Sequence, residues 1–147
     1  LEDKVIFDPA TFTAPEGMEI VEEEGNKYLK VTPNEYNSNI HLPDGIDVSN
    51  YTSVEITLYN KETGDWQNVI SLKNYSDENL TDDEKNICGQ YGAAKLADKK
   101  GVVTYTAALT GSKFITDIQP IIQLPSNNYS ATKDKTKYIG KIVVKTK

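Results

Sequence analysis

Aromatic side chains stand directly beside amide side chains at four places in this 147-residue sequence. The rings are one tryptophan and three of the nine tyrosines, and the amides are asparagine and glutamine. The four groups are Trp66 with Gln67 and Asn68, Tyr36 with Asn37 and Asn39, Tyr91 with Gln90, and Tyr129 with Asn127 and Asn128. We therefore asked first what chemistry a flat ring next to an uncharged donor and acceptor can perform.

This combination matches the chemistry of a sugar, which presents apolar C–H faces and rows of hydroxyl groups. Each amide supplies a carbonyl acceptor and two N–H donors, so it can bridge neighbouring hydroxyls. A structural alternative stays open, because Tyr, Asn and Gln are also common on β-sheet surfaces and in turns. In particular, Trp66 shares strand parity with Ile70 and Leu72 and could belong to the core.

Two further amides sharpen the expectation. Gln119 and Gln123 lie four residues apart in one strand-like run, so both should project from the same face of a sheet. If Gln67 lies on an adjacent strand, the three could line a groove. The candidate ligand-binding residues are thus Tyr36, Asn39, Trp66, Gln67, Gln90, Tyr91, Gln119, Gln123 and Tyr129.

The sequence contains no recognisable catalytic set. His41 is the only histidine and lies between Ile40 and Leu42 in a strand-like run, without a GxSxG or Cys–His arrangement. Its 22 acidic residues would yield carboxylate pairs by chance, and many crowd into solvated runs such as residues 22–24 and 82–84. We therefore expect no enzyme activity and no catalytic residues.

No metal or cofactor site is expected either. Cys88 is the only cysteine, which excludes an internal disulfide and the usual zinc patterns. Carboxylates at Asp8, Glu22 or Glu24 could supply oxygens to a structural calcium ion, although their spacing matches no defined calcium loop.

Charge and composition restrict the classes of partner that the chain can bind. The net charge is −6, and all 16 basic residues are lysines, so the forked arginine donor that reads phosphates and bases is missing. Nucleic acid is an unfavourable partner, and the overall field would repel a polyanion or an anionic membrane, although local lysine patches remain. No apolar run reaches the length of a transmembrane helix.

The composition of the segments that must position these side chains predicts β-strands. Val, Ile, Thr and Tyr are abundant, and short runs are separated by Gly, Pro, Asn and Asp, which is the pattern of an antiparallel sandwich. Length predicts one domain over residues 1–147, with no internal repeat or linker. The expected strands cover residues 5–7, 18–21, 28–32, 39–42, 54–59, 66–73, 102–107, 115–124 and 138–144.

Three local patterns add detail to these strands. Val54, Ile56 and Leu58 alternate with polar or amphipathic residues, which predicts one buried face. Gly140 interrupts the last strand and predicts a bulge or a close approach of another chain segment. Glu24-Gly25-Asn26 is typical of a turn between two strands.

Three stretches resemble a known group of proteins: NKYLKVTPNEYNSNIHLP, DVSNYTSVEITLYN and KYIGKIVVKT. They are similar to jelly-roll carbohydrate-binding modules of bacterial xylanases and related glycoside hydrolases, the group around families 4, 9, 16 and 22. The resemblance implies two antiparallel sheets, with ligand in a cleft across the concave sheet, on strands that carry Asn39, Gln67, Gln90 and Gln119 or Gln123. Such modules often carry Asp, close to a calcium site, where this chain has Gly140.

The resemblance also implies a function. It suggests a monomeric, non-catalytic module that binds internal stretches of xylan and targets an attached glycoside hydrolase, in a secreted or cell-surface bacterial protein of which this chain is a fragment. Two alternatives stay open: a module for β-glucan or mannan, and a structural or adhesive β-sandwich that binds no sugar.

Overall fold

The computed structural model describes residues 2–31, 38–42, 51–61, 71–74, 78–79, 81, 100–109, 120–124 and 136–146. At positions 38, 39, 71 and 120–124 it describes the backbone alone. Every regular element in these ranges is a β-strand. The strands are β1 (Lys4–Phe7), β2 (Glu19–Glu23), β3 (Asn26–Val31), β4 (Ser38–His41), β5 (Tyr51–Asn60), β6 (Ser71–Asn74), β7 (Gly101–Ala108), β8 (Pro120–Leu124) and β9 (Lys137–Thr146).

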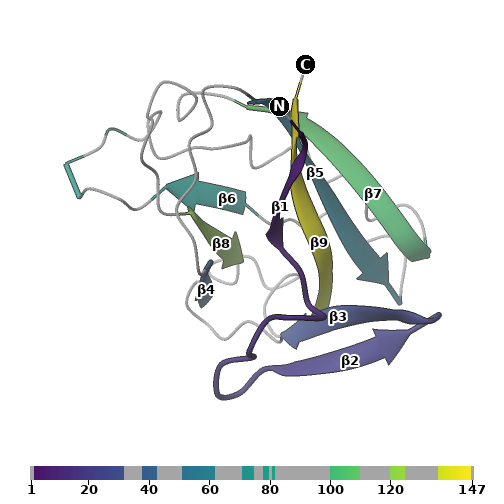
Figure 1. Cartoon of the computed structure of the whole chain (residues 1–147). Helices are drawn as coiled ribbons and strands as arrows, with labels where there is room; N and C mark the ends of the chain where they lie inside the picture. Colours follow the sequence, from purple (N-terminus) through teal and green to yellow (C-terminus); the bar gives the residue numbers. More distant parts are fainter. Residues whose placement is uncertain are drawn as a thin grey trace.

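The strands form two antiparallel sheets, a large one of six strands and a small one of three (Figure 1). In the large sheet the order is β2-β3-β9-β5-β7, and β1 pairs with β9 as well. In the small sheet the order is β4-β8-β6. The chain therefore builds each sheet from segments that are distant in sequence, because β9 at the C-terminus pairs with β1, β3 and β5.

Strand β5 shows why these residues form a half-buried sheet. Val54, Ile56 and Leu58 are at most 1% exposed, whereas the residues between them are half-buried. This alternation is the two-residue period of a strand with one face on the core. The predicted burial of Val54, Ile56 and Leu58 is confirmed.

A tight hairpin joins β2 to β3. Glu23 pairs with Asn26, which leaves Glu24 and Gly25 as the two central turn residues, with φ of 49° and 83°. Positive φ at both central positions defines a turn whose twist matches that of the flanking strands. Glycine adopts this conformation at little cost, so the predicted turn at these residues is confirmed.

Gly140 is both a bulge and a point of close approach. Between β5 and β9 the pairs Ile56–Ile142 and Leu58–Ile139 enclose one residue on β5 and two on β9. A Cβ atom at Gly140 would lie 3.0 Å from the carbonyl oxygen of Thr57 and 3.1 Å from Cε1 of Tyr28. Only glycine leaves room here without displacing a neighbour, and both alternatives predicted for this residue are present.

One core lies between the two sheets. Ile40, Leu42 and Leu72 from the small-sheet region join a single buried cluster with large-sheet residues such as Leu29, Ile56 and Ile142. Phe7 and Phe12 close one side of this cluster with an edge-on ring contact, their centroids 5.0 Å apart. The molecule is a β-sandwich of two antiparallel sheets, as predicted.

The predicted strands correspond to the observed ones with shifts of a few residues at their ends. Of the run predicted over 66–73, the described part is β6, and of the run over 115–124 it is β8. Residues 62–70 and 110–119 lie outside the described ranges. None of the described segments forms a helix long and apolar enough to cross a membrane.

Candidate functional site

Two of the predicted site residues meet on the small sheet. Asn39 on β4 and Gln123 on β8 are direct Cα partners, although they are far apart in sequence. On the other side of β8, Gln123 is also the direct partner of Ser71 on β6. The three positions form one row across all three strands, which we call the amide row.

The amide row belongs to the face that points away from the core. Directly paired residues of an antiparallel sheet share a face, and successive residues along a strand alternate between faces. Ile40 and Leu72, each one residue further along its strand than the amide row, are 1% exposed and lie in the core. Positions 39, 71 and 123 therefore lie on the outer face.

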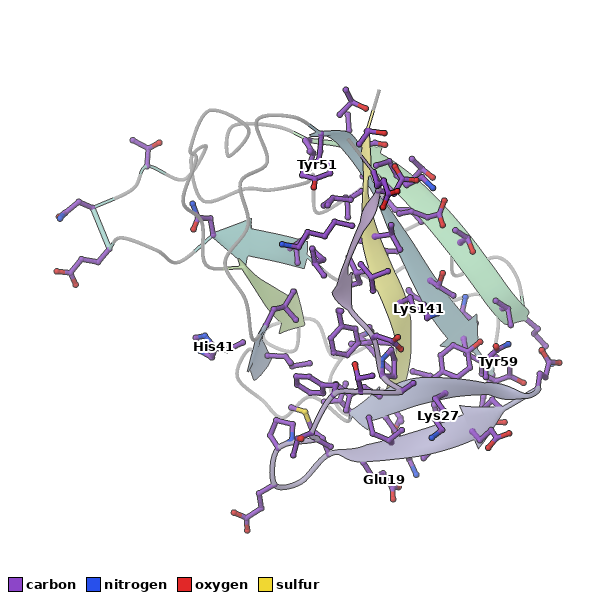
Figure 2. The ribbon with its side chains drawn as sticks, viewed as in Figure 1. Glu19, Lys27, His41, Tyr51, Tyr59 and Lys141 are labelled. Atoms are coloured by element: carbon purple, nitrogen blue, oxygen red, sulfur yellow. The ribbon has the colours of Figure 1, made fainter. Side chains whose placement is uncertain are left out.

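A second row crosses the same face two residues along each strand. His41 and Lys73 are both direct partners of Ile121, on opposite sides of β8. His41 is exposed and lies on the side of β4 away from the large sheet (Figure 2), and Lys73 is half-buried. We call His41, Ile121 and Lys73 the cation row, after its two basic members.

Together the rows place hydrogen-bonding groups at intervals that match the geometry of a sheet. Neighbouring strands lie about 4.8 Å apart, and residues two apart along a strand lie about 6.8 Å apart. Amide and hydroxyl groups at the amide row can donate and accept, whereas the histidine and lysine add donors. Such a face can bind a polar, hydroxyl-rich ligand, but it holds no carboxylate or thiol nucleophile within its three strands.

The other predicted site residues lie outside the described ranges. These are Tyr36, Trp66, Gln67, Gln90, Tyr91, Gln119 and Tyr129. Their role in ligand binding, like that of Asn39 and Gln123, remains a prediction. Nothing in the sequence links Lys73 to His41, because that link runs through the pairing of both residues with β8.

A tyrosine cluster marks the outer face of the large sheet. The ring centroids of Tyr28 and Tyr59 are 5.5 Å apart, and those of Tyr59 and Tyr138 are 6.2 Å apart. The ammonium of Lys61 lies 4.8 Å from the centre of the Tyr138 ring and 2.7 Å from Oε1 of Glu23. Tyr28 is buried, and Tyr59 and Tyr138 are half-buried.

This cluster is packed against itself and does not form a platform. The Tyr28 ring is buried because it occupies the space left by the missing side chain of Gly140. The Tyr59 and Tyr138 rings meet at 83°, and Lys61 lies over the Tyr138 ring. A sugar stacks on a flat, open ring, so this arrangement suits stabilisation of the sheet better than ligand binding.

The pKa shifts of Tyr28 and Lys61 also support a stabilising role for the tyrosine cluster. Burial, and then the nearby Glu24 charge, raise the pKa of the Tyr28 hydroxyl, which keeps it neutral. A hydrogen bond to Glu23 raises the pKa of Lys61, which keeps the ammonium charged. Neither group is prepared to exchange a proton near neutral pH, so the cluster has no features of an acid–base site.

Ion pairs occupy much of the remaining large-sheet surface. Lys30 lies 3.4 Å from Glu19, and Lys145 lies 3.0 Å from Asp3 and 4.0 Å from Glu55. An open pocket borders β2, and the described residues that line it, Gly17, Met18, Glu19 and Lys30, include neither an aromatic nor an amide side chain.

Acidic side chains near the first strands were considered as calcium ligands. The described ranges contain no group of three or more His, Cys, Asp or Glu side chains that could hold a metal ion. One of the three carboxylates considered from the sequence, Asp8, instead organises a turn. Its Oδ1 accepts a hydrogen bond from the backbone N–H of Ala10.

Comparison with known proteins identifies the fold. The chain matches no protein-family model and no curated protein sequence. Among solved structures it is similar to a low-affinity xylan-binding module, CBM86, from the gut symbiont Roseburia intestinalis. The TM-score is 0.52 at 17% sequence identity, over 99% of this chain and 96% of that one. The fold is that of a carbohydrate-binding module.

The extent of the match matters as much as its score. Because the alignment spans nearly all of both chains, the carbohydrate-binding-module fold accounts for the whole sandwich and not for one sheet.

Proposed function

We propose that this chain is a non-catalytic module that holds internal stretches of a xylan-type polysaccharide on the outer face of the small sheet. The observation that carries the proposal is the amide row, in which Asn39 and Gln123 pair directly and Ser71 extends the row to β6. The structurally similar protein is itself described as a xylan-binding module, which supports the choice of ligand.

Binding would depend on hydrogen bonds and ring stacking. The amide row crosses the strands, so successive sugars of a chain lying along it would meet successive strands about 4.8 Å apart. Amides at Asn39 and Gln123 would bridge hydroxyls. The residues Gln67, Gln90 and Gln119 would add further bridges, and Trp66, Tyr36, Tyr91 and Tyr129 would stack on sugar faces.

The wider role follows from the same proposal. A module that binds a polysaccharide without cleaving it raises the local concentration of an attached enzyme at its substrate. We therefore propose a monomeric unit of a secreted or cell-surface bacterial protein, linked to a glycoside hydrolase and related to the group around families 4, 9, 16 and 22.

Titration calorimetry with matched oligosaccharides tests the proposal. Xylohexaose should bind, and cellohexaose and mannohexaose separate xylan from β-glucan or mannan as the ligand. Replacing Gln123 or Asn39 with Ala should weaken binding by about 1–3 kcal/mol if each amide hydrogen bond is lost. Thr106→Ala, an exposed change on the large sheet, is the matched control and should leave affinity unchanged.

Trp66→Ala separates two roles for the single tryptophan. If the ring stacks on sugar, the variant should fold normally and lose about 1–3 kcal/mol of binding, by analogy with stacking on nucleobases. If it melts at a much lower temperature instead, Trp66 belongs to the core.

Two further outcomes would contradict the proposal. Absence of heat with all three oligosaccharides, and of any change in Trp66 fluorescence with longer glycans, would favour a structural or adhesive sandwich. Release of reducing ends from xylan by the purified chain would show an enzyme.

A further inference from the structure

The cation row lies beside the amide row on the same face, and its position suggests which polysaccharide the sheet prefers. We propose that His41 and Lys73 bind the carboxylate of a uronic acid, so that the preferred ligand is an acidic polysaccharide. This inference rests on the proposed function, because it assigns a preference to the same binding face.

The geometry allows both side chains to reach one group. His41 and Lys73 pair with Ile121 from opposite sides, so their Cα atoms are two strand spacings apart, roughly 9–10 Å. A carboxylate above the position of Ile121 would lie between the two. His41 is exposed, and Lys73 is half-buried.

The spacing between rows fits a branched ligand. The cation row lies two residues from the amide row on every strand, about 6.8 Å away. If a sugar backbone follows the amide row across the strands, a side group on that backbone extends along the strands. It would then reach the cation row without displacing the backbone.

Charge composition separates this face from the rest of the protein. The three small-sheet strands contain His41 and Lys73 as their ionisable residues and no Asp or Glu, although the chain carries 22 acidic residues. An added anion would be attracted most strongly where no acidic residue shares the sheet.

The net charge of −6 limits how many carboxylates a bound polysaccharide can carry along its backbone. A fully charged polyuronate would be repelled by the overall field, as the sequence indicates. Isolated carboxylates on a neutral backbone would meet the cation row at short range while the long-range repulsion is screened beyond about 10 Å at 0.1 M salt. Uronic acid side groups on xylan therefore fit better than a polygalacturonate backbone.

The test compares one polymer with and without its charge. We would measure affinity for glucuronoxylan, for the same glucuronoxylan after chemical reduction of its carboxyl groups, for xylohexaose and for polygalacturonate. The unmodified protein should bind glucuronoxylan roughly threefold to tenfold more tightly than the reduced polymer, which is the range of exposed to partly desolvated ion pairs.

Variants assign the preference to the cation row. Lys73→Gln and His41→Gln should each lower the ratio toward one, and Lys73→Arg should keep it high because the charge is kept. Lys141→Gln removes the same charge at an exposed position of the large sheet and should leave the ratio unchanged (Figure 2). Thermal melting of each variant would confirm that it folds.

The outcomes separate the two proposals. Xylohexaose binding with a ratio of one would overturn the uronate inference and leave the proposed function intact. A ratio that stays high in both Gln variants would overturn the assignment to His41 and Lys73. Binding of polygalacturonate without binding of xylohexaose would support carboxylate recognition and contradict a xylan ligand, and binding of none would contradict both.

Discussion

The outer faces of the two sheets use the same fold in different ways. The large sheet closes its outer face with side chains that contact one another, namely three packed tyrosines and the ion pairs of Lys30, Lys61 and Lys145. The small sheet presents an amide row and a cation row with no carboxylate in its strands. We propose that this outer face is the one that binds ligand.

The difference teaches how a sandwich can separate stability from binding. Contacts across the large sheet tie the distant strands β3, β5 and β9 together, so they stabilise the fold. Ile40 and Leu72 anchor the small sheet from its core side. Substitutions on its outer face should therefore affect binding more than stability. Each variant below is expected to change one property and leave the other.

The largest expected effect is loss of the anchor beneath the small sheet. Leu72→Ala removes a side chain that is 1% exposed and leaves a cavity, so the free energy of unfolding should fall by about 2–5 kcal/mol. Urea denaturation would measure it, with Leu58→Ala on the large sheet as the comparison. A loss below about 0.5 kcal/mol for Leu72→Ala alone would show that the small sheet does not share the core.

The next effect is on the large sheet. Gly140→Ala places a Cβ about 3 Å from Thr57 and Tyr28, so overpacking should cost about 1–3 kcal/mol of stability. Oligosaccharide affinity, measured below the melting temperature, should be unchanged. Thr106→Ala on the same face should change stability by less than about 0.5 kcal/mol. A Gly140→Ala variant as stable as the parent would mean that Tyr28 can move aside freely.

The tyrosine cluster gives a more direct way to break the comparison. Tyr59→Leu keeps much of the apolar surface and removes the ring contacts with Tyr28 and Tyr138, which should cost about 0.5–1.5 kcal/mol of stability. Calorimetry with xylohexaose should give the same affinity as the parent. A clear loss of affinity in a folded Tyr59→Leu protein would move the binding face to the large sheet.

The smallest effect concerns an exposed ion pair. A hydrogen bond from the backbone N–H of Thr146, and then the neighbouring Lys145, lower the pKa of Asp3. A lowered pKa in the folded state stabilises the protein above the unfolded value of about 3.9, and this contribution disappears as pH falls through the folded value. Asp3→Asn should therefore melt slightly lower than the parent at pH 7.

At low pH the same variant provides its own control. Once Asp3 is protonated in both states, the melting temperatures of the parent and of Asp3→Asn should converge. A difference that persists unchanged below pH 2 would show that the effect does not depend on the charge of Asp3.

Local features of the fold were predictable from neighbouring residues. The alternation in β5, the turn at Glu24 and Gly25, and the special place of Gly140 all depend on short-range sterics and on the two-residue period of a strand. These are properties that a segment carries wherever it lies.

The candidate site was predictable only in its chemistry. The abundance of amides beside rings indicated a sugar ligand, and parity placed residues such as Gln123 on a face. The pairing of β8 with β4 and β6 decides on which face Gln123 lies and which residues are its neighbours there. These three strands are separated by long stretches of chain. The meeting of Asn39 with Gln123, and of His41 with Lys73 across Ile121, has no local signal.

By itself, then, the sequence determined a β-sandwich with alternating strands, a lysine-only basic set and a side-chain chemistry suited to sugars. Tertiary structure alone decided that Tyr28 fills the space at Gly140 and that the amide row and the cation row lie side by side on the small sheet. The physical reason is that strand propensity and turn geometry act over a few residues. Strand pairing is settled instead by the shared core, which brings distant segments into register.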